Sequence, residues 1–170
     1  EDNSIYVGND PSSTTSTASY NVALGTTALD AITTGDKNVA IGYGALTANT
    51  TGAQNTASGA YSLYSNTTGN QNTASGRSSL NSNTTGANNA ASGFKSLYSN
   101  TNGYYNTASG CQSLFLNTGG GYNTASGNQS LYSNTGNFNT ASGAASLYSN
   151  TTGSNNTAFG YNAQASANNA

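Results

Sequence analysis

The chain has 170 residues, of which 34% are hydrophobic and 5% are charged, and its formal net charge is −2. So few apolar residues argue against a thick globular core, while so few charges differ from the charge-rich composition of a disordered chain. Three Lys and Arg side chains in the whole chain argue against a basic nucleic-acid-binding surface.

A five-residue phrase, Asn-Thr-Ala-Ser-Gly in its commonest form, recurs along the chain. Its glycines lie 17 residues apart, with one step of 16, at Gly8, Gly25, Gly42, Gly59, Gly76, Gly93, Gly110, Gly127, Gly143 and Gly160. A fixed period of this length indicates a repeat architecture, in which each unit stacks on its neighbours.

The repeat divides the chain into three parts. Residues 1–20 have no Leu at the position where later repeats have one, and they are predicted to form a degenerate N-terminal capping coil. Residues 21–165 carry the 17-residue repeat, and residues 166–170 are a tail or the start of a further coil.

A leucine follows each corner glycine by four residues in eight repeats, at Leu29, Leu46, Leu63, Leu80, Leu97, Leu114, Leu131 and Leu147. We expect each coil to contain a short strand Asn-Thr-Ala-Ser, a corner at Gly, a second strand around Ser-Leu-Tyr-Ser-Asn, and a Thr-Thr-Gly turn. The predicted fold is an all-β parallel β-solenoid, or β-roll, of about ten 17-residue coils. Apolar residues do not recur at helical spacing within a repeat, which argues against helices.

The alternation of a strand places Asn, Ala and Gly of the phrase on one face and Thr and Ser on the other. The constant Ala predicts a tightly packed interior that Leu fills. Val22, Leu24, Val39 and Ile41 lie on the opposite face and would also prefer burial, which predicts packing against neighbouring chains. In later coils that opposite face is a hydroxyl ladder, made of Thr56, Ser58, Thr73, Ser75, Thr107, Ser109, Thr124, Ser126, Thr140 and Ser142.

Two phrases carry a resemblance to known proteins: Asn-Val-Ala-Ile-Gly-Tyr-Gly-Ala-Leu at residues 38–46, and Leu-Tyr-Ser-Asn-Thr-Thr-Gly at residues 63–69. Joined by Asn-Thr-Ala, they resemble the repeats of phage and virus tail fibres and, more distantly, the head repeats of trimeric autotransporter adhesins. The resemblance extends from about Ser4 to Ala163. It implies a left-handed parallel β-roll, assembled as a homotrimer, at an outer surface. This chain differs from adhesin heads in its longer repeat of 17 residues and in having Thr and Ser where adhesin heads have Val and Ile.

Catalytic and metal-binding residue sets are missing from the sequence. The chain has no His, and no Asp or Glu follows Asp36, so the repeats cannot assemble a Ser-His-Asp triad, a pair of glycosidase carboxylates or an Asp-rich calcium repeat. Cys111 stands alone and cannot form a disulfide within the chain. We therefore expect no enzymatic activity and no cofactor or metal.

An aromatic series occupies the position next to the inward Leu, at Tyr64, Tyr98, Phe115, Tyr132 and Tyr148. One interpretation is that the rings stabilise the stack by contact along the rod or between chains. The other is a strip that stacks on the sugar rings of a cell surface.

These patterns predict the structural shaft or adhesive segment of an extracellular or virion-surface fibre. We expect a homo-oligomer, with a cell-surface glycan or protein as a possible receptor, and neither nucleic-acid binding nor membrane insertion. Two alternatives are a self-assembling extracellular filament and an ice-binding β-solenoid that uses the Thr/Ser ladder.

Overall fold

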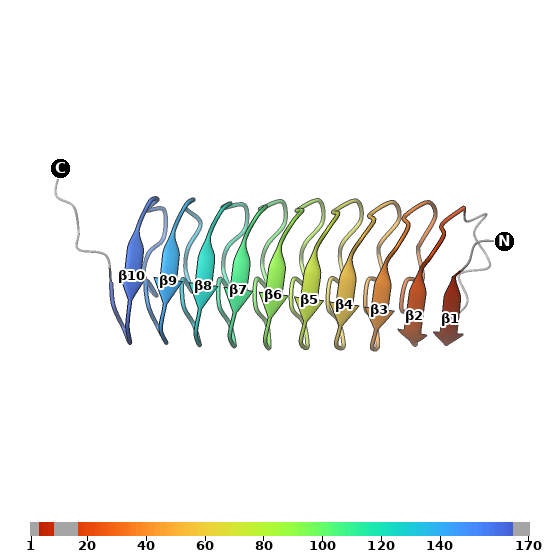
Figure 1. The fold of residues 1–170 in the computed structure, drawn as a ribbon, viewed down its shortest axis with the longest axis horizontal. Helices are drawn as coiled ribbons and strands as arrows, with labels where there is room; N and C mark the ends of the chain where they lie inside the picture. Colours follow the sequence, from red (N-terminus) through yellow and green to blue (C-terminus); the bar gives the residue numbers. More distant parts are fainter. Residues whose placement is uncertain (1–3, 9–16, 165–170) are drawn as a thin grey trace.

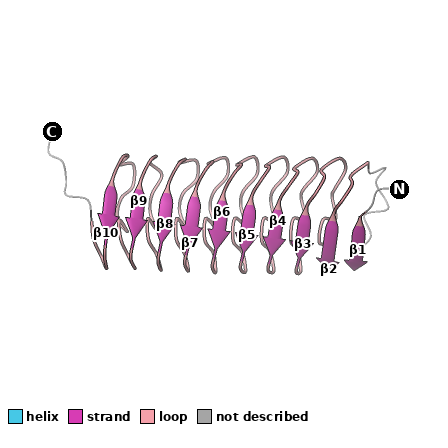
Figure 2. Ribbon diagram, viewed as in Figure 1, coloured by secondary structure: helices cyan, strands magenta, loops and turns pink. Residues whose placement is uncertain are grey.

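A computed structural model describes residues 4–8 and 17–164. Ten strands form one parallel sheet, and each strand pairs with the next strand along the chain (Figure 1). The segments between them are loops and turns, and the described residues contain no helix (Figure 2). The strands are β1 (Ile5–Gly8), β2 (Val22–Gly25), β3 (Val39–Ile41), β4 (Thr56–Ser58), β5 (Thr73–Ser75), β6 (Ala90–Ser92), β7 (Thr107–Ser109), β8 (Thr124–Ser126), β9 (Thr140–Ser142) and β10 (Thr157–Phe159). The predicted all-β parallel solenoid is confirmed.

The register of the sheet places equivalent repeat positions side by side. Ala57 pairs with Ala74, and Thr124 of β8 pairs with Thr140 of β9, although this coil is one residue shorter than the others. The missing residue is therefore absorbed outside the strands. At the N-terminal end Ile5 pairs with Val22, so β1 belongs to the same sheet. Residues 1–3 and 9–16 of the predicted capping coil, and the predicted tail at 166–170, lie outside the described residues.

The prediction of a second strand in each coil is wrong, because each coil contains one strand. The segment around the conserved Leu consists of turns, and Leu63 has a φ of +48°, in the left-handed region rather than the extended one. Its backbone still bonds to the next coil, because Leu63 N donates to Ser79 O (3.0 Å) and Ser65 N donates to Asn81 O (3.0 Å). Left-handed residues turn the chain sharply without giving up these bonds between coils.

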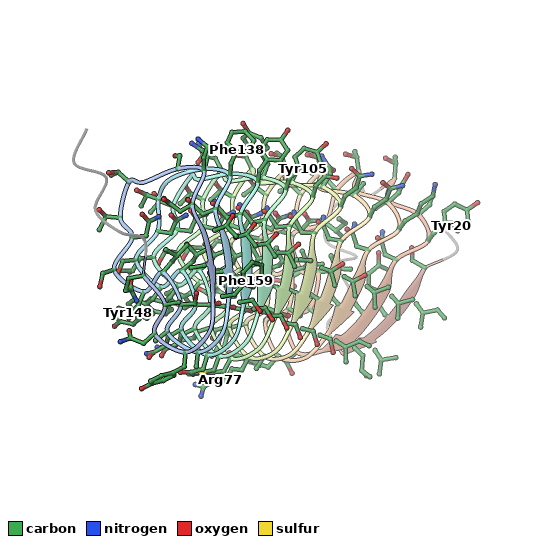
Figure 3. The ribbon with its side chains drawn as sticks, turned by 60° about the vertical axis from the view of Figure 1, so that its left-hand side comes forward. Tyr20, Arg77, Tyr105, Phe138, Tyr148 and Phe159 are labelled. Atoms are coloured by element: carbon green, nitrogen blue, oxygen red, sulfur yellow. The ribbon has the colours of Figure 1, made fainter. Side chains whose placement is uncertain are left out.

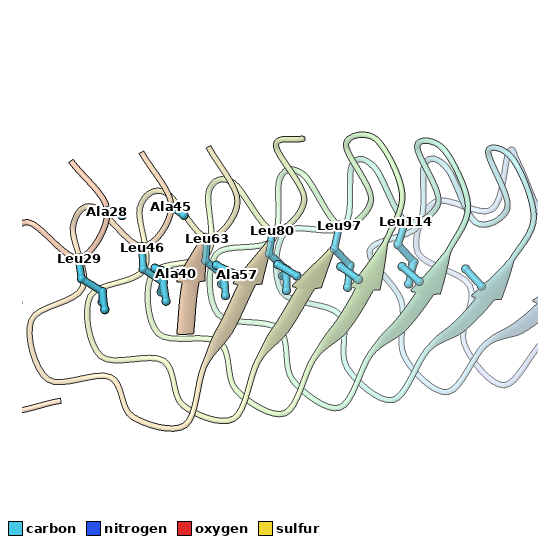
Figure 4. Close-up of a cluster of buried hydrophobic side chains, with 14 of the residues drawn as sticks. Ala28, Leu29, Ala40, Ala45, Leu46, Ala57, Leu63, Leu80, Leu97 and Leu114 are labelled. Carbon is cyan, nitrogen blue, oxygen red and sulfur yellow. The ribbon is translucent and has the colours of Figure 1, made fainter. Parts of the chain in front are cut away.

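The core is a thin column of Ala and Leu side chains along the rod (Figure 4). The strand Ala and the turn Leu are buried from coil to coil; Ala57 and Leu63 are both 0% exposed. Burying a Leu side chain stabilises a fold by about 1.5–3 kcal/mol, so eight such leucines are a major apolar contribution. The predicted inward Ala and Leu are confirmed.

Two ladders of buried Asn side chains complete the interior. In the first, the Asn of the phrase bonds to its equivalent: Asn55 Nδ2 donates to Asn38 Oδ1 (3.2 Å) and to Gly69 O (2.8 Å). In the second, the Asn before the turn does the same: Asn66 Nδ2 donates to Asn49 Oδ1 (2.8 Å). Each amide thus donates a hydrogen bond to the equivalent amide of the preceding coil, which compensates for the burial of so many polar groups.

The shortened coil breaks the second ladder at one point. Asn134 Nδ2 donates to Gly136 O (3.0 Å), whereas Asn117 Oδ1, which would be its partner in a regular coil, is a buried oxygen with no hydrogen bond. The first ladder also changes here, because Asn139 Nδ2 donates to Asn134 Oδ1 (3.0 Å) rather than to the equivalent Asn of the preceding coil. The one-residue deletion therefore leaves one buried acceptor unpaired, at a cost of about 1–3 kcal/mol.

The corner glycine is required by both conformation and space. Gly59 has a φ of +136°, which disfavours any residue with a Cβ. A Cβ at this position would also lie 2.7 Å from the carbonyl carbon of Gly76 in the next coil. The corners can stack at this separation because each is a glycine.

Candidate functional site

The hydroxyl ladder lies on the outward face of the sheet. In β4, β5, β7 and β8 the central Ala is buried while the flanking Thr and Ser are exposed, and in β9 the flanking residues are partly exposed. Equivalent hydroxyls pair in register; Thr56 lies beside Thr73, and Ser58 lies beside Ser75. The face that the sequence left undecided therefore points away from the interior of its own chain.

Aliphatic side chains replace the hydroxyls at the N-terminal end of this face. The pairing of β1, β2 and β3 aligns two columns, Ile5–Val22–Val39 and Val7–Leu24–Ile41. The exposed fraction of these side chains reaches 61% at Ile5, 55% at Val7 and 48% at Leu24. We call these six residues the aliphatic patch. At the opposite end of the same face Phe159 is also exposed (Figure 3).

Four of the five predicted aromatic residues form a continuous stack. The ring centroids of Tyr98, Phe115, Tyr132 and Tyr148 are separated in turn by 5.2, 5.2 and 4.9 Å, with interplanar angles of 11–12°. Contact of the rings along the rod is thus present. Because neighbouring rings cover each other's faces, this first aromatic ladder presents mainly ring edges to solvent.

Tyr64 is separate from this stack, because the intervening coil has Asn81 at the same repeat position. Its ring instead packs edge to face with Tyr61 (5.6 Å), which packs likewise with Tyr43 (5.2 Å). Loss of surrounding water, followed by the neighbouring Tyr43 phenol, raises the pKa of Tyr61. This group of rings lies near the aliphatic end of the rod.

Cations lie beside the first aromatic ladder at one end. Lys95 Nζ is 5.3 Å from the ring centroids of both Phe94 and Tyr98, and the Arg77 guanidinium is 6.0 Å from the Phe94 centroid. These distances are those of cation–π contacts, which stabilise by about 0.5–1 kcal/mol at exposed sites.

A second set of stacked aromatic residues was missed by the sequence interpretation. Tyr105, Tyr122 and Phe138 stack with centroid distances of 5.1 and 5.0 Å, and Tyr104 packs at right angles to the first two of them. The four rings are 45–56% exposed, whereas the four stacked rings of the first ladder are half-buried. In Figure 3, Tyr105 and Phe138 lie along one edge of the rod, away from Tyr148 and Arg77. The available signal was an aromatic residue directly before the phrase in three consecutive repeats.

Other chemistry is sparse in the described part of the chain. Cys111 is a partly exposed free thiol, and no group of three or more His, Cys, Asp or Glu side chains is placed to hold a metal ion within residues 4–8 and 17–164. Over the same residues, no helix has the length and apolar character needed to cross a membrane.

Comparison of the chain with protein-family models, with curated proteins and with solved structures found no match. The resemblance to fibre repeats therefore stays an expectation based on the sequence.

Proposed function

We propose that this chain is a segment of the shaft of an extracellular or virion-surface fibre, in which copies associate laterally through the outward face of the sheet. The shaft would carry or contribute to attachment at a cell surface. A homotrimer is the assembly that the fibre resemblance implies.

The observation that supports this proposal is the chemistry of the outward face. In the described strands its side chains are aliphatic, hydroxyl-bearing or aromatic, and none of them is charged. The aliphatic patch leaves several large apolar side chains exposed at neighbouring positions of the sheet, a feature that marks interaction surfaces. An uncharged face does not repel a second copy of itself, so neighbouring chains can bury the patch together.

Sedimentation velocity of the purified chain and of Ile41→Lys tests the association. Ile41 is 42% exposed, so a Lys at this position can reach solvent in a single chain. In a buried interface the ammonium would lose its water at a cost of several kcal/mol. We expect the wild type to sediment as a discrete oligomer and I41K as a monomer with an unchanged circular dichroism spectrum.

Leu116→Lys is the matched control, because Leu116 is 41% exposed but lies outside the strands. It should leave the oligomer intact. A monomeric wild type, or equal dissociation by both variants, would contradict lateral association through the sheet. Open-ended polymers in electron micrographs would favour the alternative of a self-assembling filament, with β10 of one copy meeting β1 of the next.

Ice binding is a second candidate, favoured by the regular exposure of the Thr and Ser columns on β4, β5, β7 and β8. A repeating array of hydroxyls can order water at the spacing of the coils. Thermal hysteresis of the folded wild type should then be measurable and should fall when Thr107 and Thr124 are replaced by Lys. Absence of hysteresis in the folded wild type would eliminate this candidate.

A further inference from the structure

We infer that Tyr104, Tyr105, Tyr122 and Phe138 form a binding site for a neutral oligosaccharide. We call these four residues the aromatic corner. The inference deepens the attachment part of the proposed function and rests on it, because it assigns the contact to one place on the rod and to one class of ligand.

The first support is a local departure from the repeat. The turn after the conserved Leu segment reads Thr-Thr-Gly at residues 33–35, 50–52, 67–69, 84–86 and 151–153. The three other turns are Thr-Asn-Gly at 101–103, Thr-Gly-Gly at 118–120 and a shortened Thr-Gly at 135–136. These three are consecutive, and they are the turns that lead into the aromatic corner.

Gly119 in the second of these turns, and Gly121 directly after it, lie beside side chains of the preceding coil. A Cβ at Gly121 would lie 3.4 Å from Cε2 and Cζ of Tyr104 and 3.0 Å from its carbonyl oxygen, so the Tyr104 ring reaches over this glycine. A Cβ at Gly119 would lie 2.8 Å from Asn102 Oδ1, so the amide of Asn102 reaches over that glycine. Gly119 thus leaves room for the Asn102 amide, and Gly121 brings no side chain that would stack on the Tyr104 ring.

The orientation of Tyr104 distinguishes this group from the first aromatic ladder. Its plane is at 80° to Tyr105 and 82° to Tyr122, which themselves stack at 12° along the rod. A ring perpendicular to that stack lies lengthwise, and no stacked neighbour from the next coil covers its face, because the equivalent position there is Gly121. Tyr104 is 45% exposed in this position.

The size of the exposed surface suits a ligand. Four rings that are each about half exposed present roughly 300–500 Å² of contiguous aromatic surface. This is the size of the largest apolar patch on a typical monomeric protein, which is often functional.

The ligand class follows from the absence of charge and the presence of amides. No Asp, Glu, Lys or Arg follows Lys95 in the sequence, so this half of the chain offers no side-chain charge to attract an anionic or cationic ligand. Asn88 and Asn155 occupy the position of the stacked rings in the coils on either side. Exposed Asn137 accepts a hydrogen bond from Gly121 N (2.8 Å) through Oδ1, which leaves its NH2 group to donate outward. Aromatic rings that contact the C–H face of a pyranose, with amides that bond its hydroxyls, are the chemistry of neutral sugar recognition.

Titration calorimetry with a panel of hexasaccharides of glucose, mannose and N-acetylglucosamine, with a heparin hexasaccharide as the anionic comparison, tests the inference. We expect at least one neutral sugar to bind the full wild-type chain and the heparin fragment not to bind. Tyr104→Ala should weaken binding about tenfold, which corresponds to about 1.4 kcal/mol. Gly121→Tyr keeps every ring but places a side chain in the space that the Tyr104 ring occupies, so it should displace Tyr104 and weaken binding to a similar extent.

Tyr148→Ala is the matched control, because it removes a ring of the same kind from the end of the first aromatic ladder. It should leave the affinity unchanged, and circular dichroism should show all three variants folded.

The inference is overturned if no neutral sugar binds, if heparin binds in preference, or if Y104A and Y148A weaken binding equally. It is also overturned if Y104A dissociates an oligomer that I41K leaves intact, because the aromatic corner would then be a contact between copies. A wild type that oligomerises but binds no neutral sugar would contradict this inference alone, whereas a monomeric wild type that binds sugar would contradict the proposed shaft alone.

Discussion

Replacement of single asparagines in the second Asn ladder should have very different costs at positions of equal burial. Asn83 and Asn117 occupy the same repeat position and are both 0% exposed. Asn83 Nδ2 donates to Asn66 Oδ1 (2.7 Å), and its Oδ1 accepts from Asn100 Nδ2 (2.7 Å). Asn117 Nδ2 donates to Asn100 Oδ1 (3.1 Å), but its own Oδ1 has no partner.

The expected loss of stability follows from the number of buried donors and acceptors that each variant leaves without a hydrogen bond. Asn83→Ala leaves one acceptor and one N–H unpaired, at about 1–3 kcal/mol each, or about 2–6 kcal/mol in total. Asn117→Ala leaves one acceptor unpaired but removes the oxygen that was already unpaired, so these two effects nearly cancel. The carbonyl oxygens that each amide also contacts, on Gly86 and Gly120, keep a second donor in both variants. The lost side-chain volume is the same and cancels in the comparison.

Urea unfolding followed by circular dichroism measures this difference. At a slope of about 2 kcal/mol per molar urea, 2–6 kcal/mol shifts the midpoint by about 1–3 M. N83A should therefore unfold about 1–3 M earlier than N117A. If N117A is destabilised as much as N83A, the hydrogen-bond ladder is not what determines the stability of this column.

Two further comparisons use matched positions and the same unfolding assay. Gly59→Ala should destabilise by about 1–3 kcal/mol through its positive φ and by about a further 1–3 kcal/mol through overlap with the backbone of Gly76. Gly160→Ala should show the first effect alone, because no atom of the described residues other than its chain neighbours lies within 4 Å of the added Cβ. Equal losses would show that stacking of the corners does not require glycine. Leu97→Ala should cost about 2–5 kcal/mol because Leu97 is fully buried, and Leu116→Ala should cost less than about 0.5 kcal/mol because Leu116 is 41% exposed. A large loss in the second variant would mean that Leu116 is covered by another chain.

The predicted second strand shows where local sequence misled the interpretation. Ser-Leu-Tyr-Ser-Asn alternates as a half-buried strand does, and Leu is indeed buried while the next position is partly exposed. Yet the Leu residues have φ values near +50°, and of the non-glycine residues described with positive φ only Thr27 is β-branched. No Val or Ile occupies these positions of positive φ, whereas the strands contain Val22, Val39 and Ile41, and this was the signal that distinguishes the two conformations.

The sites differ in how far the sequence could locate them. The first aromatic ladder was visible because its residues share one repeat position, and their contact follows from the period. The aromatic corner depends also on Tyr104 and Gly121, which occupy equivalent positions in adjacent coils and have nothing in common as residue types. That the Tyr104 ring lies over a glycine of the next coil is a property of the register and cannot be derived from either residue alone.

The period, the corner glycines and the inward Ala and Leu could all be predicted from the sequence, because a parallel stack repeats one local conformation and its constraints appear at fixed spacing. The tertiary structure alone decided that each coil has one strand, that Asn amides bond from coil to coil, and that the Thr and Ser columns face outward. These features depend on hydrogen bonds between residues 16 or 17 positions apart, whose geometry is fixed only when the coils are stacked. The outward face and the aromatic corner are consequently surfaces of the stack, and no single repeat contains either of them.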